Sequence, residues 1–148
     1  MLLLLAQIAM ATVRADRPWS FSGIIGLPGG FGVDLGWQPS DRLGLDLQLS
    51  SWLAISDLGL QARGFVLADD RRALTVVGGV HALFAPILFE PGALDLELGL
   101  GGEYRAPTGF TIGGELGPAL WLSDPHHTEG GGGISPAAFG RLRVGYSW

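Results

Sequence analysis

Apolar residues alternate with small or polar residues along most of this chain. The clearest example is residues 94–105, where the leucines and Tyr104 all occupy even positions and the charged residues all occupy odd positions. Successive side chains of a β-strand point to opposite faces, so this pattern indicates a strand with one apolar and one polar face. An α-helix, with 3.6 residues per turn, would scatter the same leucines around its whole surface.

The same pattern predicts eight strands and therefore an all-β fold. They are expected at residues 19–26, 31–38, 43–53, 58–67, 74–84, 94–105, 110–122 and 138–148. Most of the segments between them are rich in Pro, Gly, Asp and Ser, which favour turns. Pro118 falls inside one predicted strand and has no N–H to donate, so we expect a bulge or an early end of pairing near Gly117.

The first residues of the chain differ from the rest. Residues 1–15 are mostly apolar as far as Val13, and the composition changes abruptly at Asp16. This predicts a secretory signal peptide, residues 1–15, followed by one domain over residues 16–148; the alternative is a short buried N-terminal helix. About 12 apolar residues are too few to span a bilayer, and no other segment reaches the ~18 that a membrane helix needs.

A closed β-barrel is the other structure that satisfies every backbone polar group inside lipid. Strands of about ten residues, separated by turns, are typical of outer-membrane barrels. If both chain ends face the periplasm, the two longest connections, residues 85–93 and 123–137, face outward, as in such barrels. The outward connections at residues 27–30 and 54–57 are as short as the inner turns and do not follow this rule.

Composition narrows the possible functions. The 148 residues are 47% apolar, with 25 glycines and no cysteine, which excludes a disordered tail, a disulfide-stapled scaffold and a cysteine-based metal site or catalyst. All nine basic residues are arginine, and 14 acidic residues leave a net charge of −5. Nucleic acid is not an expected partner, because binding phosphates requires a surplus of basic charge.

Aromatic residues gather at one end of the predicted strands, on the apolar face. Tryptophan and tyrosine concentrate at membrane interfaces, so these residues are predicted to form an interfacial girdle at the end that carries the termini. They are Trp19, Trp37, Tyr104, Phe110, Tyr146 and Trp148. Trp52 and Trp121 lie near the opposite ends but at polar positions, so a second girdle is not predicted.

Over residues 19–148 the chain resembles the small eight-stranded bacterial outer-membrane barrels, the group that includes the OmpA transmembrane domain, OmpX and OmpW. Residues 141–148 alternate and close on an aromatic residue, similar to the assembly signal of that group, in which the last residue is usually phenylalanine. The resemblance implies an antiparallel up-and-down transmembrane barrel in the bacterial outer membrane. It also implies contact with outer-membrane lipid and with the barrel assembly machinery through the C-terminal strand, and we expect a monomer.

An apolar face toward lipid would turn the polar face into the lumen, the space that the strands enclose. The predicted lumen residues are Asp34, Asp46, Gln48, Gln61, Arg63, His81, Asp95, Glu97, Glu103, Arg105, Glu115, Arg141 and Arg143. Eight strands leave an interior just wide enough for side chains, where unpaired charges would be costly. We therefore predict a plugged lumen with ion pairs, among them Glu115 with Arg143 and Asp46 with Arg63. The alternative is a polar pathway.

Ten or so of the glycines lie at lumen positions, where they would either leave a cavity or permit bends, and we expect bends. They include Gly32, Gly36, Gly44, Gly59, Gly79, Gly99, Gly101, Gly113, Gly117 and Gly145.

Few residues point to chemistry. His126 and His127, with Asp124 and Glu129 nearby, could hold a transition metal, but a polyglycine loop supplies little preorganisation. We therefore expect neither a metal nor a cofactor. Some small outer-membrane barrels are lipid A deacylases with a histidine and a serine two residues apart on a strand, which the loop residues His126 and Thr128 match poorly. His81 is expected to be a hydrogen-bonded structural residue.

These observations favour an outer-membrane β-barrel protein that is not an enzyme. Its role would be structural or would involve surface interactions through the loops at residues 85–93 and 123–137. Three alternatives are a small passive channel or hydrophobic-solute carrier similar to OmpW, an outer-membrane lipid-modifying enzyme, and a soluble lipocalin-like barrel. The last has an apolar interior and would place the same charges outside.

Overall fold

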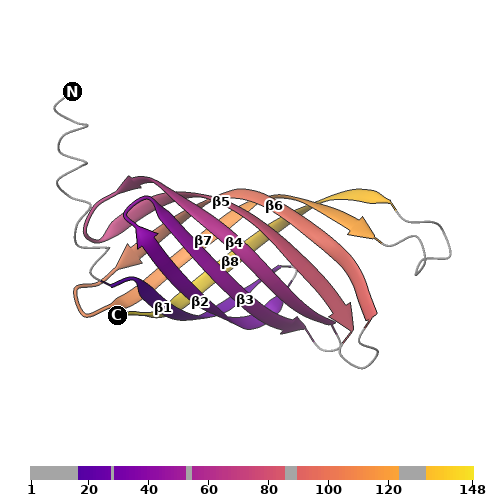
Figure 1. The fold of residues 1–148 in the computed structure, drawn as a ribbon, viewed down its shortest axis with the longest axis horizontal. Helices are drawn as coiled ribbons and strands as arrows, with labels where there is room; N and C mark the ends of the chain where they lie inside the picture. Colours follow the sequence, from indigo (N-terminus) through magenta and orange to yellow (C-terminus); the bar gives the residue numbers. More distant parts are fainter. Residues whose placement is uncertain (1–16, 28, 53–54, 86–89, 124–132) are drawn as a thin grey trace.

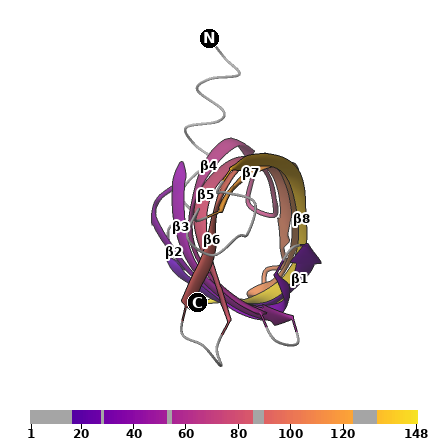
Figure 2. The ribbon, with the colours of Figure 1, turned by 90° about the vertical axis from the view of Figure 1, so that its right-hand side faces the viewer.

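A computed structural model describes residues 17–27, 29–52, 55–85, 90–123 and 133–148. Eight strands form one closed sheet in which each strand pairs antiparallel with the next and β8 returns to β1 (Figures 1 and 2). The strands are β1 (Trp19–Leu27), β2 (Gly30–Ser40), β3 (Leu43–Trp52), β4 (Ile55–Ala68), β5 (Arg72–Ala85), β6 (Glu90–Arg105), β7 (Phe110–Ser123) and β8 (Ile134–Ser147). The predicted all-β, up-and-down barrel is confirmed. No helix in these ranges could cross a membrane. The predicted signal peptide lies outside the described residues.

The hairpins extend further than the alternating pattern predicted. β4, β6 and β8 begin at Ile55, Glu90 and Ile134 rather than at residues 58, 94 and 138. Backbone pairing continues there through positions whose side chains do not alternate, as at Leu120↔Pro136 and Trp121↔Ser135. The connections predicted at residues 85–93 and 123–137 are therefore shorter in the structure, because β6 and β8 begin earlier.

The start of β1 and the end of β8 lie at the same end of the barrel, which we call the terminal end (Figure 1, left). There the backbone N–H of Trp19 donates to the Trp148 carbonyl at 3.2 Å, and the N–H of Trp148 donates to the Trp19 carbonyl at 3.0 Å. The turns after β2, β4 and β6 lie at this end too, and we call the opposite end the loop end. In the turn after β4, the Asp69 carboxylate accepts the backbone N–H groups of Arg71 and Arg72.

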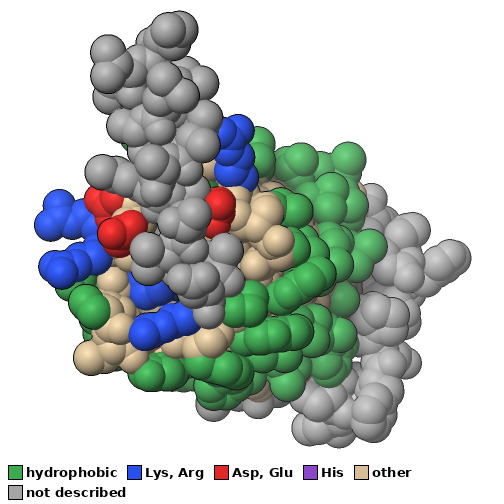
Figure 3. Space-filling view, turned by 60° about the vertical axis from the view of Figure 1, so that its left-hand side comes forward, with side chains coloured by type: hydrophobic (Ala, Val, Ile, Leu, Met, Phe, Trp, Pro, Cys, Tyr) green, Lys and Arg blue, Asp and Glu red, His purple; other side chains and the backbone are tan. Residues whose placement is uncertain are grey.

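The wall of the barrel separates apolar from charged side chains. Leucines such as Leu98, 61% exposed, and Leu116, 69% exposed, point outward, whereas Asp46 and Asp95 are at most 1% exposed in the interior. Figure 3 shows apolar side chains over the wall and charged side chains at the terminal end. A lipocalin-like barrel would have the reverse arrangement.

Of the two outcomes expected near Gly117, a bulge or an end of pairing, Pro118 causes a loss of pairing on one side and no bulge. β7 keeps one register with β8 through Pro118↔Ala138, and its pairing with β6 is interrupted between Leu116 and Ala119 without a change of register. Register shifts occur elsewhere, nearer strand ends, on β2, β4 and β6. Because proline lacks an N–H, losing pairing on one side is sufficient, and the strand does not need an extra residue.

Gly117 permits a close approach of the two backbones at this interruption. A Cβ at Gly117 would lie 2.5 Å from the Gly99 Cα and would also overlap the Leu98 carbonyl. We expect Gly117→Ala to lower the free energy of unfolding by about 1–3 kcal/mol, since the backbone must shift. Urea unfolding of the protein in detergent micelles, followed by tryptophan fluorescence, measures this change.

The control is Gly78→Ala on β5, where a Cβ would meet only the Glu97 carbonyl oxygen, at 3.8 Å. That substitution should be neutral or stabilising by up to about 1 kcal/mol. Equal effects of the two substitutions would contradict the interpretation.

Candidate functional site: the ion-paired lumen

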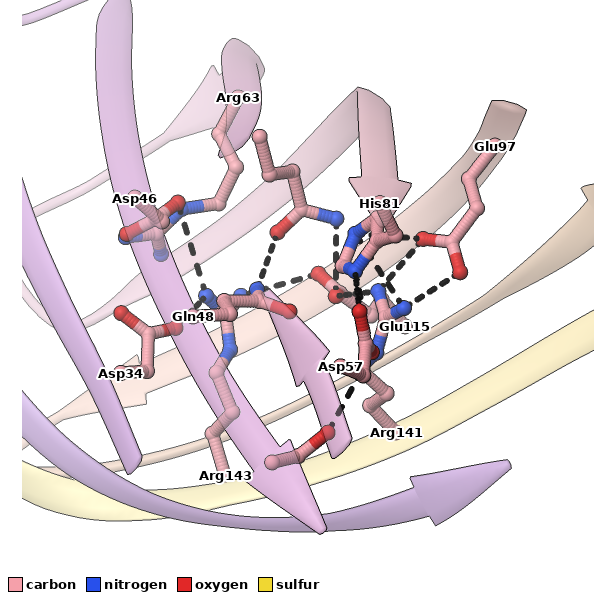
Figure 4. Close-up of polar contacts among 12 residues, drawn as sticks. Asp34, Asp46, Gln48, Asp57, Arg63, His81, Glu97, Glu115, Arg141 and Arg143 are labelled. Atoms are coloured by element: carbon pink, nitrogen blue, oxygen red, sulfur yellow. Dashed lines mark hydrogen bonds and ion pairs between the residues drawn. The ribbon is translucent and has the colours of Figure 1, made fainter. Parts of the chain in front are cut away.

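Side chains from all eight strands fill the lumen, because alternate residues of every strand point inward. Of the predicted lumen residues, Glu103 is partly buried, its side chain 8% exposed. The others are buried: Asp34, Asp46, Gln48, Gln61, Arg63, His81, Asp95, Glu97, Arg105, Glu115, Arg141 and Arg143. Most of them form one hydrogen-bonded network along the barrel (Figure 4).

Arg63 on β4 organises the half of the network nearest the terminal end. Its guanidinium donates two hydrogen bonds to the two carboxylate oxygens of Asp46 on the neighbouring β3. Its third nitrogen, Nη1, donates to Glu103 Oε2 on β6 at 2.8 Å. Glu103 also accepts from Arg105 at 3.4 Å. The planar guanidinium suits this arrangement because it can serve two carboxylates at once.

Arg143 on β8 connects three strands across the lumen. Its Nη1 donates to Asp34 Oδ2 on β2 at 3.2 Å and lies 3.8 Å from Asp46 Oδ2, and its Nη2 donates to Glu115 Oε2 on β7 at 3.2 Å. Both predicted ion pairs, Glu115 with Arg143 and Asp46 with Arg63, are therefore present.

Arg141, two residues earlier on β8, organises the other half of the network. It donates to both carboxylate oxygens of Glu97 on β6, with Nη1 2.6 Å from Oε2. The same Nη1 donates to Glu115 Oε1 at 3.3 Å. Its guanidinium carbon lies 5.0 Å from the centre of the Phe139 ring, a cation–π contact. Glu115 thus joins the Arg141 and Arg143 halves.

His81 on β5 extends the network toward the loop end. Its Nδ1 lies 3.1 and 3.2 Å from the two carboxylate oxygens of Asp57, and its Nε2 lies 3.3 Å from Glu97 Oε2. Asp57 accepts a further hydrogen bond from Ser50 Oγ at 3.3 Å. His81 therefore has the structural, hydrogen-bonded environment that was expected.

Asp57 is a lumen residue that the sequence interpretation assigned to a turn. It is 3% exposed on β4, which begins earlier than predicted. The alternating pattern could have identified Asp57, because this residue continues the series of lumen positions Gly59, Gln61 and Arg63.

Two glutamines bridge the middle of the lumen. Gln48 Nε2 donates to Gln61 Oε1 at 2.9 Å, and Gln61 Nε2 donates to Glu115 Oε1 at 2.9 Å. The network thus runs without a break from Glu103, near the terminal end, to Asp57 and Ser50, near the loop end.

Several lumen glycines make room for a neighbouring side chain, and at others, such as Gly32 and Gly145, the backbone of the next strand approaches closely. A Cβ at Gly59 would overlap the His81 ring, and one at Gly36 would lie 2.7 Å from an Asp46 carboxylate oxygen. At Gly101 the obstacle is Thr75 Oγ1, at 2.7 Å. At these three positions a polar side chain thus occupies the space over a glycine of the adjacent strand.

The lumen also contains an apolar cluster that the alternating pattern did not predict. Val77, Ala119 and Phe139 are at most 3% exposed and pack together, and Trp121 and Ala137 pack against them. These residues occupy lumen positions on β5, β7 and β8. Their burial together fills part of the interior with hydrocarbon, and the network occupies the rest.

A cavity near the terminal end, between Asp34, Arg63, Glu103, Arg105 and Arg143, has a volume of about 10 Å³. That volume holds at most about one water molecule. An ion with its hydration shell does not fit there.

The predicted girdle residues lie on the outer surface at the terminal end, each between 38% and 53% exposed. Trp19 and Trp37 are register partners whose rings stack with centres 6.1 Å apart. At the loop end, Trp52 is 52% exposed and its ring stacks on Phe31 at 6.4 Å. The alternating pattern predicted Trp52 on the polar face. That prediction is wrong, because the alternation ends before the last residues of β3.

Within the described ranges, no group of three or more His, Asp or Glu side chains has an arrangement that could hold a metal ion. His126 and His127, with Asp124 and Glu129, lie outside those ranges. No family model matches the chain, and no curated protein or solved structure shows significant similarity to it. Its function must therefore be inferred from the geometry of the barrel itself.

Arg141 is the residue whose loss should be most disruptive, because Glu97 and Glu115 both depend on it. We expect Arg141→Met to destabilise the barrel by about 3–5 kcal/mol, since it leaves buried carboxylates without their partner. Adding Glu97→Gln to the same chain should recover part of the loss.

Urea unfolding in micelles measures both changes. The control is Arg72→Met, an exposed arginine at the start of β5, which should change stability by less than about 0.5 kcal/mol. An Arg141→Met barrel as stable as the control would show that the network does not hold the lumen together.

Proposed function

We propose that this chain is an integral outer-membrane β-barrel protein with an ion-paired, closed lumen, and that its role is structural or involves interactions at the surface. The observation that carries the proposal is the orientation of the wall, with large apolar side chains outward and charged side chains inward. Contiguous apolar surfaces beyond a few hundred Å² are rare on soluble monomers and mark contact with a membrane or a partner. Here they cover all sides of a closed sheet.

The terminal end has the features of a membrane interface. The aromatic girdle lies on its outer surface, and Arg42, Arg71 and Arg72 are exposed in the adjacent turns and strand end. Aromatic rings favour the level of the lipid headgroups. These features support a periplasmic position for the short turns, and the C-terminal strand is the segment we assign to contact with the assembly machinery.

The lumen favours a structural role over the two transport alternatives. A passive channel needs a continuous space. The network and the apolar cluster instead occupy the lumen that the described residues enclose, and the cavity at its terminal end, between Asp34 and Arg143, has a volume of about 10 Å³. A carrier of hydrophobic solutes needs an apolar route, whereas charged side chains line this lumen from one end to the other. The lipid-modifying alternative depends on His126 and His127. It predicts that lipid A modification is lost in cells that express the protein with both histidines substituted.

An outward charge distinguishes a membrane barrel from a soluble one. We expect Leu98→Arg, in the middle of β6, to reduce stability in lipid vesicles by about 2–4 kcal/mol, because it places a charge in hydrocarbon. Leu67→Arg, equally outward but near the terminal end of β4, should cost at most about 1 kcal/mol. Urea unfolding in vesicles compares them. A neutral Leu98→Arg would contradict membrane insertion.

A closed lumen should not conduct ions. In planar bilayers, we expect the purified protein to give no sustained conductance above that of bilayers without protein, because ion-paired side chains and the apolar cluster occupy the described lumen. A steady ohmic current that scales with the number of inserted barrels would favour the passive channel instead.

A further inference from the structure

One carboxylate in the lumen has no partner. Asp95 on β6 is 0% exposed, and neither of its carboxylate oxygens has a hydrogen-bond partner in the part of the chain that the structure describes. A buried carboxylate without compensation is costly, and in proteins such groups are paired with an opposite charge, coordinate an ion or are neutralised. Asp95 therefore requires a proton or a positive charge that the described side chains do not bring into hydrogen-bond contact with it.

The side chains around Asp95 do not supply that charge. Glu97, two residues along the same strand, repels Asp95, whereas His81 on β5 and Arg141 on β8 attract it. Arg141 is bound by Glu97 and Glu115, and His81 is bound by Asp57 and Glu97.

The side chains of the described lumen carry a net negative charge. Its carboxylates outnumber its arginines even when His81 is counted as positive. The carboxylates belong to Asp34, Asp46, Asp57, Asp95, Glu97, Glu103 and Glu115, and the arginines are Arg63, Arg105, Arg141 and Arg143.

A second group beside Asp95 is also unpartnered. Trp121 on β7 is the register partner of Asp95, and its buried indole Nε1 has no acceptor among the described residues. A carboxylate that needs a positive charge and an N–H that needs an acceptor thus lie on adjacent strands at one level of the lumen.

We propose that Asp95 and Glu97 hold one small monovalent cation in the lumen, either an alkali-metal ion or a proton shared between the two carboxylates. Oxygen ligands suit a hard cation. Ca²⁺ takes six to eight of them, and Mg²⁺ held by two carboxylates keeps several waters, so a small monovalent cation makes the fewest demands on this site. The inference builds on the closed, ion-paired lumen of the proposed function, but it does not depend on the membrane location.

The test compares wild type with Asp95→Asn, which keeps the shape of the side chain and removes its charge. Both are unfolded with urea in zwitterionic micelles at pH 8, in sodium chloride and in choline chloride of equal ionic strength. If the site binds sodium, a concentration ten times the dissociation constant raises the folded-to-unfolded ratio of wild type about tenfold over choline. Asp95→Asn should show no such gain. Asp70→Asn, an exposed carboxylate in the turn after β4, should respond as wild type does.

A second arm identifies the source of the charge. In choline chloride, lowering the pH from 8 to 6 should stabilise wild type relative to Asp95→Asn if the carboxylates share a proton, and sodium should then have little effect. A gain from sodium at pH 8 identifies the alkali-metal ion. Equal responses of wild type and Asp95→Asn to sodium and to pH would overturn the proposal.

A third measurement does not depend on the folding of Asp95→Asn. Occupancy of the site should change the emission of Trp121, which is isolated by subtracting the spectrum of Trp121→Phe from that of wild type. A difference spectrum that neither sodium nor pH changes would also overturn the proposal. All these measurements use micelles, so their failure would leave the membrane assignment standing, and a neutral Leu98→Arg would leave the cation site standing.

Discussion

The interior of an eight-stranded barrel leaves little room for water, so each charge within it depends on another side chain. The described lumen meets this constraint by placing arginines between carboxylates from different strands. Arg63 connects β3 and β6 to β4, while Arg141 and Arg143 connect β2, β6 and β7 to β8. Most of these contacts join strands that are not neighbours in the sheet. The network therefore braces the barrel across its interior, whereas backbone hydrogen bonds hold it only around its circumference.

Cross-lumen bracing also fixes the register of the strands. A slip of one residue between two strands would turn the lumen residues of one strand to the outer surface. For β8 that would move Arg141 and Arg143 out of reach of Glu97 and Glu115, and it would bring leucine and valine inward. The apolar cluster at Val77, Ala119 and Phe139 opposes the same slip by its shape. Charge and shape thus select one pairing among those that backbone hydrogen bonds alone would allow.

Strand alternation was sufficient to predict the fold class and the placement of most lumen residues, because parity is a local property of each strand. The Asp46–Arg63 and Glu115–Arg143 pairs could be predicted because both partners lie at similar depths on adjacent strands. Contacts such as Arg63 with Glu103 could not, since they depend on which strands face each other across the closed barrel. Asp57, Trp52 and the start of β8 were misjudged where backbone pairing and side-chain alternation end at different residues. The loss of pairing at Gly117 and Pro118 could be predicted from the missing N–H of proline, but its restriction to one side of the strand has no signature in the sequence.

The position of the arginines along the chain has a consequence for how the barrel closes. Arg141 and Arg143 lie on the last strand, whereas their partners lie on β2, β6 and β7. Until β8 docks, Asp34, Glu97 and Glu115 repel one another without those counterions. β8 supplies both the last backbone hydrogen bonds, those to β1, and the positive charge that neutralises the carboxylates. A sheet of the first seven strands is therefore stabilised little by curving toward a closed barrel. Assembly should therefore be late and abrupt, with few half-closed species.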